Sequence, residues 1–352
     1  MKNLIDLKDF SLVEIKKIIE KAFEVKKNPE QFKDSMQGKI LATLFFEPST
    51  RTQFSFQTAM YRLGGHTIGF SDYSSSSVSK GENLKDTIKI VSGYSDILVI
   101  RHYLEGAAFL ASLYSGCFVI NAGDGGHLHP TQTLTDIFTI LEYKKKLSNL
   151  TIGICGDLKF GRAVNSLVEF LVRLKGNKIV LISSENLTLS NYLKEKIEKS
   201  ENVFTSSSSL KESISDLDVL YMTRIQKERF KEEQKKEENL IVLDESILKL
   251  AKKDLLIMHP LPRTKEIDFL VDEDKRAVYF KQAVNGIFVR MAIILYLFDC
   301  EKEEKKKRIE EKKFVCKNIN CITKFESYSP KYFKKEEGRF FCEYCEKQAF
   351  EI

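Results

Sequence analysis

The sequence predicts an α/β protein made of two parallel-sheet α/β lobes and a small C-terminal zinc domain with four cysteine ligands. Over the first 300 residues, apolar strand-like runs alternate with segments of helical periodicity, which is typical of parallel sheets covered by helices. The alternation is interrupted at residues 130–150, where a long helical segment separates two sets of strands. Four of the seven cysteines follow residue 315, in two closely spaced pairs. These observations predict two lobes and a metal-binding appendix.

Length and charge exclude several classes of protein. A chain of 352 residues can form two or three domains, and its 43% hydrophobic residues exclude wholesale disorder. No run approaches about 18 uncharged apolar residues, and the N-terminus has no apolar signal core, so we expect a cytoplasmic chain that does not cross a membrane. The net charge of +6 could indicate a nucleic-acid partner. Residues 301–352, however, mix 14 Lys and Arg with 11 Asp and Glu, which is unsuited to following phosphates, so we expect no such partner.

The first lobe is expected to span residues 1–132. Ser11 and Glu14 form the pattern of a capping box, which predicts a helix that continues to about residue 27. A buried strand at 40–46 leads into a helix at 50–63, which the pair Gly64 and Gly65 ends. The other elements expected here are strands at 66–70, 96–100 and 117–121 and a helix at 82–93.

A helix at 130–145 is expected to lead into the second lobe, residues 133–281. We interpret 206–209 as a polar loop and 226–238 as a charged, mobile one. The helix at 282–300 is apolar on most sides, so we expect it to be buried and to pack back on the first lobe. Residues 301–315 form a charged linker to the zinc domain at 316–352. The strands expected in the second lobe are 150–155, 178–182, 218–222 and 254–258, and the helices are 162–175, 190–199 and 245–251.

The segment F-E-P-S-T-R-T, residues 46–52, combines three features of an anion-binding site. A strand ends there, a helix begins, and polar donors stand at the start of that helix. N–H groups at a helix N-terminus, together with hydroxyls and a guanidinium, can bind phosphate or carboxylate. The alternative is an ordinary N-cap with an incidental arginine. The candidate residues are Ser49, Thr50, Arg51 and Thr52.

Three further arginines follow strands in a similar way. Arg101 comes directly after the strand at 96–100, Arg162 opens the helix after the next lobe's first strand, and Arg224 follows the strand at 218–222. In open α/β sheets, ligands bind at the carboxyl ends of the strands. Clustered arginines repel one another unless anions bind among them, so the sequence predicts a ligand with several negative charges.

The segment H-L-H-P-T-Q, residues 127–132, has two interpretations. His127 and His129 could form a metal-binding pair, but no carboxylate or cysteine stands at a suitable spacing. We favour a site in which His129 polarises a carbonyl and Gln132 holds an NH2 group at a helix start. No Ser-His-Asp or Cys-His arrangement stands out, and no G-x-x-x-x-G-K-[ST] loop is present. Residues 156–162 hold only two of the glycines that an NAD-binding motif needs.

The C-terminal cysteines have the spacing of a structural zinc site. Cys316 and Cys321 are separated by four residues, Cys342 and Cys345 by two, and twenty residues lie between the pairs. The alternatives are disulfides and free thiols, and the missing secretion signal argues against disulfides. We therefore predict bound zinc, because a module this small needs metal binding to supply its folding energy.

Eight segments in order give residues 1–300 a family resemblance. They read FFEPSTRT, SSVSKGENLKDT, RHYLEGAA, NAGDGGHLHPTQTLTD, GDLKFGRAVNSL, YMTRIQKER, HPLPR and NGIFVR. The region resembles the catalytic chain of aspartate carbamoyltransferases, and residues 316–352 resemble the zinc domain of that enzyme's regulatory chain. The resemblance implies transfer of the carbamoyl group of carbamoyl phosphate to L-aspartate in pyrimidine biosynthesis, with no catalytic cofactor. It also implies a homotrimer, or a higher assembly of trimers, with active sites between subunits.

The resemblance further implies which residues contact each substrate. Thr52, Arg101 and His129 contact the carbonyl oxygen, and they form the catalytic set together with Lys80. Ser76 and Lys80 reach in from the neighbouring subunit. The residues implied for carbamoyl phosphate are Ser49, Thr50, Arg51, Thr52, Arg101, His129, Gln132, Ser76, Lys80, Pro260 and Leu261, and those for aspartate are Lys80, Arg162, Arg224 and Gln226.

A carbamoyltransferase for another amino acceptor, such as ornithine, is the alternative. Ornithine enzymes typically carry H-C-L-P and D-x-W-x-S-M segments, whereas this chain has H-P-L-P at 259–262 and no tryptophan. Arg224 suits a second carboxylate and would repel an ammonium group. The chain departs from the family in one respect, because residues 301–315 are too short to hold the nucleotide-binding domain of the regulatory chain. We expect the zinc domain either to brace the catalytic lobe or to link trimers.

Overall fold

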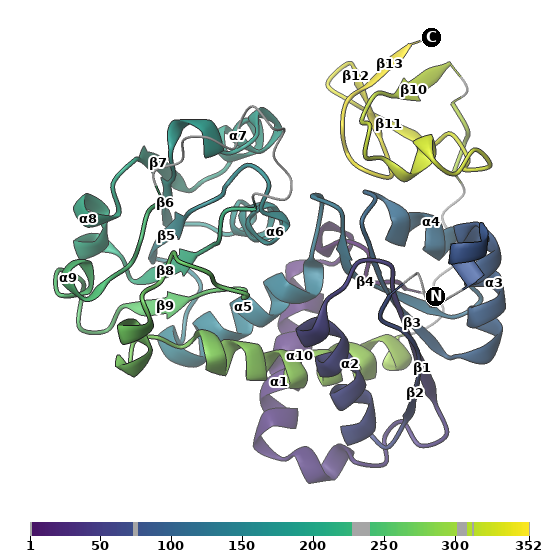
Figure 1. Ribbon diagram of the computed structural model, residues 1–352, viewed down its shortest axis with the longest axis horizontal. Helices are drawn as coiled ribbons and strands as arrows, with labels where there is room; N and C mark the ends of the chain where they lie inside the picture. The colour runs from purple at the N-terminus through teal and green to yellow at the C-terminus, as the bar shows by residue number, and fades with distance from the viewer. Residues whose placement is uncertain (1, 73–76, 227–239, 301–307, 312, 352) are drawn as a thin grey trace. The chain divides into compact units, whose positions relative to one another are not determined.

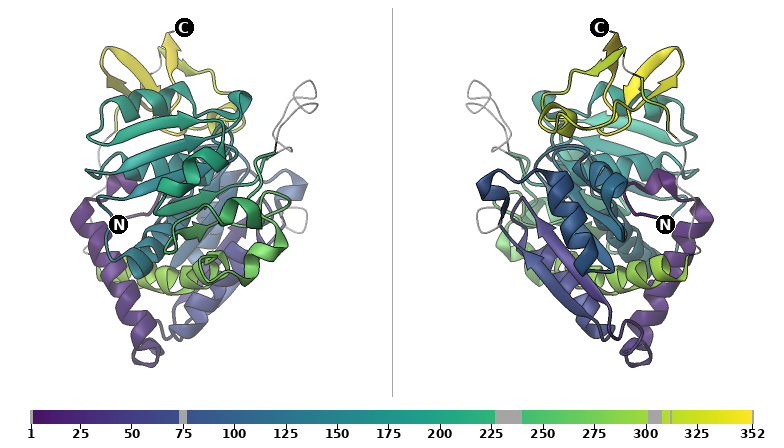
Figure 2. Two further views of the ribbon diagram at one scale, coloured as in Figure 1. Left: turned by 90° about the vertical axis from the view of Figure 1, so that its left-hand side faces the viewer. Right: turned by 90° about the vertical axis from the view of Figure 1, so that its right-hand side faces the viewer.

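The computed structural model describes residues 2–72, 77–226, 240–300, 308–311 and 313–351 (Figure 1 and Figure 2). Its contacts divide the chain into two compact units. The first comprises Met1–Thr131 and Ile287–Ile352, and the second is Gln132–Gly286. Each unit is built on one parallel sheet, which confirms the predicted fold class.

The first unit contains a sheet in the strand order β2-β1-β3-β4, and all of its pairings are parallel. The inner strands are buried along almost their whole length, because a central parallel strand is covered on both faces. Neighbouring parallel strands end at the same edge, so the segments that follow β1, β3 and β4 start near one another. The strands are β1 (Ile40–Phe45), β2 (His66–Phe70), β3 (Ile97–His102) and β4 (Phe118–Asp124).

Helices join these strands. The predicted capping box is present at the first of them, where Ser11 and Glu14 each accept the other's backbone N–H. Another helix was not expected, because its sequence A-A-F-L-A-S-L-Y is apolar on most sides and shows no helical alternation. The α-helices are α1 (Leu12–Lys27), α2 (Thr50–Arg62), α3 (Leu84–Tyr94) and the unexpected α4 (Ala107–Tyr114), and the 3-10 helices are η1 (Leu7–Asp9), η2 (Pro29–Phe32) and η4 (Ser77–Lys80).

The second unit contains a parallel sheet in the order β7-β6-β5-β8-β9. One edge strand, β7 (Val203–Ser207), was missed because its polar, half-exposed residues resemble a loop. The other strands are β5 (Thr151–Cys155), β6 (Lys178–Ile182), β8 (Val219–Met222) and β9 (Leu256–Met258). The helices of this part are α5 (Pro130–Lys144), α6 (Arg162–Leu171), α7 (Asn191–Glu198), α8 (Leu210–Ser213) and α9 (Glu245–Leu248), with 3-10 helices η5 (Glu185–Leu187), η6 (Ile214–Asp216) and η9 (Phe269–Glu273).

The long helix α10 (Tyr279–Asp299) begins in the second unit and continues into the first. It is the one helix of the described residues that is long and apolar enough to cross a membrane. However, 61% of its most apolar stretch is buried inside the protein, as in the core helix of a folded domain. This burial agrees with the buried helix predicted at 282–300.

The C-terminal module, residues 313–351, belongs to the first unit. Figure 1 shows it at the yellow end of the colour scale, and its strands pair as two small antiparallel sheets. Its cysteines and aromatic rings share one apolar cluster with α3, α4 and the adjoining strands, so the module extends the core of that unit. Its elements are β10 (Phe314–Cys316) paired with β13 (Ala349–Glu351), β11 (Phe333–Glu336) paired with β12 (Arg339–Cys342), and η10 (Ile322–Lys324).

Candidate active site and metal site

The N-terminus of α2 holds the predicted phosphate-binding residues. Ser49 is the N-cap, but its hydroxyl does not cap the helix and instead donates to Oγ1 of Thr52 at 3.1 Å. Thr52 is buried, whereas Thr50 and Arg51 are exposed. The first N–H groups of any α-helix have no partner within the helix. This end of α2 therefore presents N–H, hydroxyl and guanidinium donors together, as an anion site requires.

Arg101 lies inside β3 rather than after it, which corrects the predicted end of that strand. The strand continues to His102 because Arg101 pairs in register with Phe45 of β1. Only 8% of Arg101 is exposed. Its Nη1 donates to the carbonyl of Ala122 at 3.2 Å and its Nη2 to Oε1 of Glu47 at 3.1 Å. These two acceptors hold the guanidinium at the carboxyl edge of the sheet, the edge where α2 begins.

The turn between β4 and α5 brings His129 to the same edge. His129 is buried, and its Nδ1 lies 3.5 Å from Oγ1 of Thr131. The neighbouring His127 has a different partner, since its Nδ1 lies 3.1 Å from Oδ2 of Asp124. Across the described parts of the chain, neither histidine belongs to a gathering of three or more potential metal ligands.

The last two residues predicted for this lobe lie on the segment before α3. Lys80 ends η4 and is exposed, as a residue that reaches another subunit must be. Ser76 lies outside the described residues.

In the second unit, Gln132 is held by a buried carboxylate that the sequence did not reveal. Nε2 of Gln132 donates to Oδ1 of Asp136 at 2.8 Å, one helical turn along α5. Asp136 is fully buried and also accepts from Nε2 of Gln282 at 2.7 Å and from the hydroxyl of Tyr221 at 2.9 Å. Burial and the nearby Asp136 carboxylate raise the pKa of Tyr221 well above 10, so its hydroxyl stays protonated and donates.

The same network continues to the H-P-L-P segment after β9. The backbone N–H of His259 donates to Oε1 of Gln282 at 3.0 Å, and Nδ1 of His259 accepts the N–H of Leu261 at 2.8 Å. Since Nδ1 accepts, the ring proton must be on Nε2, which lies 2.8 Å from Oε1 of Glu266. Leu261 is thereby held at φ +48°, a left-handed conformation that non-glycine residues rarely adopt. The network joins Gln132 to the segment of Pro260 and Leu261, the residues predicted for the carbamoyl NH2 group.

Burial and hydrogen bonding shift the pKa of His259, and likewise that of Glu266, in opposite directions. Burial lowers the pKa of His259, and the neighbouring carboxylate only partly opposes this effect. Burial alone would raise the pKa of Glu266, but hydrogen bonds from His259 and Thr264 lower it to about 2. The pair therefore consists of a neutral imidazole and an ionised carboxylate at neutral pH.

Apart from Lys80, the residues predicted for aspartate lie at the carboxyl edge of the second sheet. Arg162 opens α6 after β5, and Arg224 follows the neighbouring β8 by two residues. Gln226 is tied to the loop after β5, because its backbone N–H donates to Oδ2 of Asp157 at 3.0 Å and its Nε2 to the carbonyl of Phe160 at 3.0 Å. These bonds bring the two predicted segments together.

The four C-terminal cysteines gather as a metal site would require. Their sulfur atoms all lie within 4.8 Å of one another, with Cys316 and Cys345 3.5 Å apart and Cys321 and Cys342 3.9 Å apart. Tetrahedral zinc with Zn–S bonds of about 2.3 Å places its sulfurs about 3.8 Å apart. None of the cysteines forms a disulfide. The residues present therefore fit zinc.

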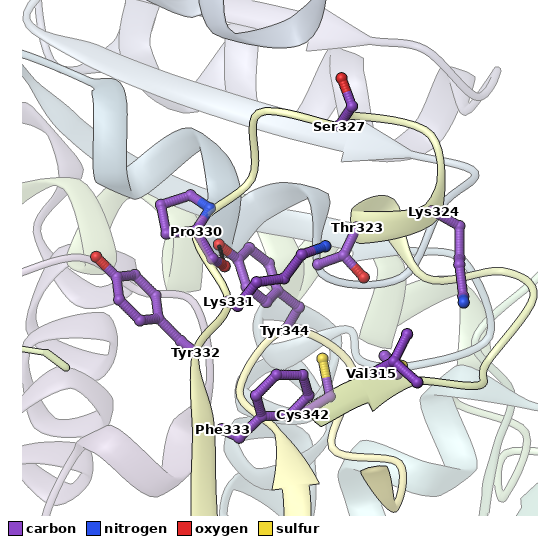
Figure 3. Close-up of a pocket in the computed structure, with 11 residues that line it drawn as sticks. Val315, Thr323, Lys324, Ser327, Pro330, Lys331, Tyr332, Phe333, Cys342 and Tyr344 are labelled. Atoms are coloured by element: carbon purple, nitrogen blue, oxygen red, sulfur yellow. Dashed lines mark hydrogen bonds between the residues drawn. The ribbon is translucent and has the colours of Figure 1, made fainter. Parts of the chain in front are cut away.

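A cavity of about 240 Å³ borders this sulfur cluster (Figure 3). Cys316 and Cys342 contribute to its wall, beside the rings of Tyr332, Phe333 and Tyr344. The sulfur cluster thus borders this cavity and also belongs to the apolar core of the first unit.

Comparison with known proteins covers both units. A family model described as the carbamoyl-P binding domain of aspartate/ornithine carbamoyltransferase matches residues 2–142, and one described as the Asp/Orn binding domain matches residues 148–297. The chain belongs to the aspartate/ornithine carbamoyltransferase family. It is 54% identical over 299 residues to the aspartate carbamoyltransferase catalytic subunit of Clostridium perfringens, covering 84% of this chain and 97% of that one.

Solved structures extend the comparison of this carbamoyltransferase. The catalytic subunit of M. jannaschii aspartate transcarbamoylase is 45% identical with a TM-score of 0.79, covering 85% of this chain and 98% of that one. The Trypanosoma cruzi enzyme, solved with aspartate and phosphate, is 37% identical with a TM-score of 0.77, covering 84% of this chain and 94% of that one.

Both family models end before the C-terminal module of this carbamoyltransferase. The residues that sequence reasoning missed are those that act through other residues: Asp136, Gln282 and Glu266. Gln132 and Asp136 lie four residues apart in one helix, a spacing that could have indicated their hydrogen bond. Gln282 lies on α10, 146 residues from Asp136, and no local pattern joins them.

Proposed function

We propose that this chain is an aspartate carbamoyltransferase. It transfers the carbamoyl group of carbamoyl phosphate to the amino group of L-aspartate, giving N-carbamoyl-L-aspartate and phosphate, in pyrimidine biosynthesis. The observation that carries the proposal is the 54% identity to an aspartate carbamoyltransferase catalytic subunit over 97% of its length. Arg162 and Arg224, placed after adjacent strands, supply a positive charge for each carboxylate of aspartate.

The first unit binds carbamoyl phosphate. Ser49, Thr50, Arg51 and Thr52 hold the phosphate at the N-terminus of α2, where N–H groups and hydroxyls converge. Thr52, Arg101 and His129 donate to the carbonyl oxygen. All are carried by segments at one edge of the sheet, and Arg101 is fixed there by Glu47 and Ala122.

The second unit recognises the NH2 group through acceptors. Gln132 gives its Nε2 to Asp136, so its Oε1 is the atom turned toward an incoming donor. Leu261 gives its N–H to His259, so its carbonyl and that of Pro260 remain as acceptors at the same segment. An NH2 group needs such acceptors, and the network supplies them in a fixed orientation.

The reaction needs no enzyme nucleophile. The aspartate amine attacks the carbonyl carbon, a C–N bond forms, the C–O bond to phosphate breaks, and the departing phosphate can take the amine proton. The protein stabilises the negative charge that develops on the carbonyl oxygen, a contribution of about 3–4 kcal/mol per donor in other acyl transfers. It also holds two anions in contact, which is the role of the arginines. Gln226 and Lys80 complete the aspartate site.

Three features complete the proposal. Zinc is bound by Cys316, Cys321, Cys342 and Cys345 and is structural, since a four-thiolate site leaves no open coordination position for chemistry. The chain works as a homotrimer, or as an assembly of trimers, in which Lys80 and Ser76 enter the neighbouring active site. It acts in the cytoplasm, in keeping with seven cysteines that form no disulfide.

Substrate profiling tests the function. With carbamoyl phosphate present, we expect rapid formation of N-carbamoyl-aspartate and no measurable citrulline from ornithine. Citrulline formation with inert aspartate would establish the ornithine alternative instead. The change Arg51→Ala should reduce kcat/KM for carbamoyl phosphate by more than about 100-fold, because a charge-assisted contact to phosphate is lost. A folded Arg51→Ala protein with unchanged turnover would contradict the phosphate site.

A further inference from the structure

The C-terminal module, itself part of the first unit, contacts the rest of that unit at the segment directly after β3. The N–H of Glu105 donates to the carbonyl of Asn320 at 2.9 Å, and the N–H of Ile322 donates to the carbonyl of Glu105 at 2.9 Å. Nδ2 of Asn318 donates to Oε2 of Glu105 at 2.8 Å. This backbone and side-chain pairing fixes the module four residues past Arg101, the residue proposed to contact the carbonyl oxygen.

The approach at this point is too close for a side chain. A Cβ atom on Gly106 would lie 2.6 Å from Cβ of Tyr344 in the module, and Gly106 has φ +84°. Its N–H donates to Oδ2 of Asp124 at 2.7 Å, at the end of β4. The same region of the chain therefore contacts both the module and the turn that leads to His129.

The module reaches that turn through Glu346. Oε2 of Glu346 lies 3.6 Å from Nε2 of His127, which is longer than a hydrogen bond but within the range of an ion pair with a protonated imidazole. The other ring nitrogen, Nδ1, lies 3.1 Å from Oδ2 of Asp124. Asp124 in turn accepts the N–H of Leu128 at 3.1 Å. The contacts form one chain from the module to the residue directly before His129, and the side chains of Glu346, His127 and Asp124 are each at most 11% exposed.

The position of Glu346 depends on the metal site. It directly follows Cys345, and its N–H donates to the carbonyl of Cys342 at 2.9 Å. Its φ of +57° is left-handed, so the backbone here is set by the tight turn that carries two of the zinc-binding cysteines. Its other carboxylate oxygen pairs with Lys8 of the first unit. The buried Glu346 carboxylate thus lies close to Lys8 and His127, both outside the module. Burying a charge is costly unless it is paired, so these neighbours matter for its placement.

We propose that Glu346 is a positioning residue for the carbamoyl-phosphate site. It fixes His127, and through Asp124 it fixes the turn that places His129. The folded zinc module thus sets the geometry of a carbonyl-oxygen donor in its own chain. The inference rests on the proposed function for the role of His129, and on the contacts alone for the ordering of the turn.

Two changes break the chain of contacts from opposite ends. Glu346→Gln removes the charge on the module side. His127→Asn keeps an amide near the position of Nδ1, facing Asp124, and removes the atom that faces Glu346. Glu343→Gln is the matched control, because Glu343 lies between the same two cysteines but pairs with Arg308 through its Oε2 at 2.9 Å.

We expect both changes to lower kcat/KM for carbamoyl phosphate by about 3- to 30-fold, in the range of coupling through packed side chains. KM for aspartate and zinc content should stay unchanged, as should all parameters of Glu343→Gln. The double variant should be no worse than Glu346→Gln alone, because Glu346→Gln already removes the contact with His127 and also weakens the pairing with Lys8 and Lys334. Hydrogen exchange of the peptide over residues 121–131 should be faster in both variants, a readout that does not depend on activity.

Three outcomes overturn the inference: His127→Asn with unchanged kinetics and exchange, additive effects in the double variant, or an equal loss in Glu343→Gln. If Glu346→Gln loses zinc, His127→Asn decides the matter alone, since it lies outside the module. Absence of any carbamoyl transfer by the wild-type chain would refute the proposed function, while the exchange measurement would still report on the turn.

Discussion

At the scale of single residues, the buried Asp136 organises one side of the proposed active site. Its two oxygens accept three hydrogen bonds, and the donors come from three separate elements. An ionised carboxylate can only accept hydrogen bonds, so the amide of Gln132 directs its Nε2 toward Asp136 and its Oε1 away from it. The identity of the buried residue therefore decides which atom the substrate meets.

Asp136→Asn tests this orientation. An asparagine offers one acceptor and one NH2 group, so at least one donor loses its partner, at a cost of about 1–3 kcal/mol. We expect kcat/KM for carbamoyl phosphate to fall by about 5- to 100-fold, measured by steady-state kinetics with saturating aspartate.

Two comparisons separate orientation from stability in this test. Tyr221→Phe removes a different donor to the same carboxylate, so it should lower the free energy of unfolding and leave the kinetics nearly unchanged. If Asp136 acts through Gln132, then adding Asp136→Asn to a Gln132→Ala variant should lower kcat/KM for carbamoyl phosphate little further. Fully additive losses would show that Asp136 has no positioning role.

At the scale of elements, the order of strands and helices was predictable because most segments carry one clear period. The errors have specific causes. Helix α4 lacks a polar face because it is buried between the sheet and the C-terminal module, so no helical alternation is visible. Strand β7 lies at an edge, where half-exposed polar residues need no apolar run. Arg101 was placed after its strand because a buried cation inside a sheet depends on partners elsewhere, here Glu47 and Ala122.

The residues of the candidate site also fall into two groups, those that the sequence indicates and those that only the structure reveals. The residues predicted to contact substrate stand in short motifs at strand ends and helix starts, which is why sequence motifs could propose them. The residues that hold them are remote in the chain, as with Gln282 and Asp136, and only packing brings them together. Aspartate binding by Arg162 and Arg224 stays a prediction, as does the entry of Lys80 from a neighbour.

The loop after β9 is an element whose stability should depend on acid. Glu266 has a folded pKa of about 2 against an ordinary value of 4.5, so it stabilises the fold above pH 4.5, and this contribution is lost as the pH falls toward 2. The full contribution is about 3 kcal/mol at neutral pH. We expect Glu266→Gln to lower the free energy of unfolding by a similar amount at pH 7, measured by urea denaturation.

The difference between wild type and Glu266→Gln should shrink as the pH is lowered from 4.5, because the Glu266 carboxylate of the unfolded chain takes up a proton there while that of the folded chain, with a pKa of about 2, stays ionised. Glu273→Gln, at an exposed site on η9, is the control and should follow the wild type at every pH. A difference that stays constant between pH 7 and pH 3 would mean that the ionised carboxylate is not what closes this loop.

At the scale of the whole molecule, the C-terminal module shares the hydrophobic core of the first unit and is not a separate domain. Its cysteines, Tyr344 and Phe333 lie in the same apolar cluster as α4 and the inner strands of the first unit. Helix α3 is tied to it as well, since the N–H of Leu84 donates to Oε1 of Glu326 at 3.0 Å and that of Lys85 to the hydroxyl of Tyr328 at 2.9 Å. These contacts are what a bracing role requires.

Loss of zinc should therefore destabilise the first unit without changing the number of subunits. We expect Cys345→Ser to release zinc and to lower the free energy of unfolding by more than about 2 kcal/mol, a fall in Tm of roughly 4–8 °C. Cys300→Ser, outside the sulfur cluster, is the control and should keep its zinc. If the module braces its own chain, native mass measured before and after chelation should stay the same. A mass that falls to that of a single trimer on chelation would instead assign the module to the joining of trimers.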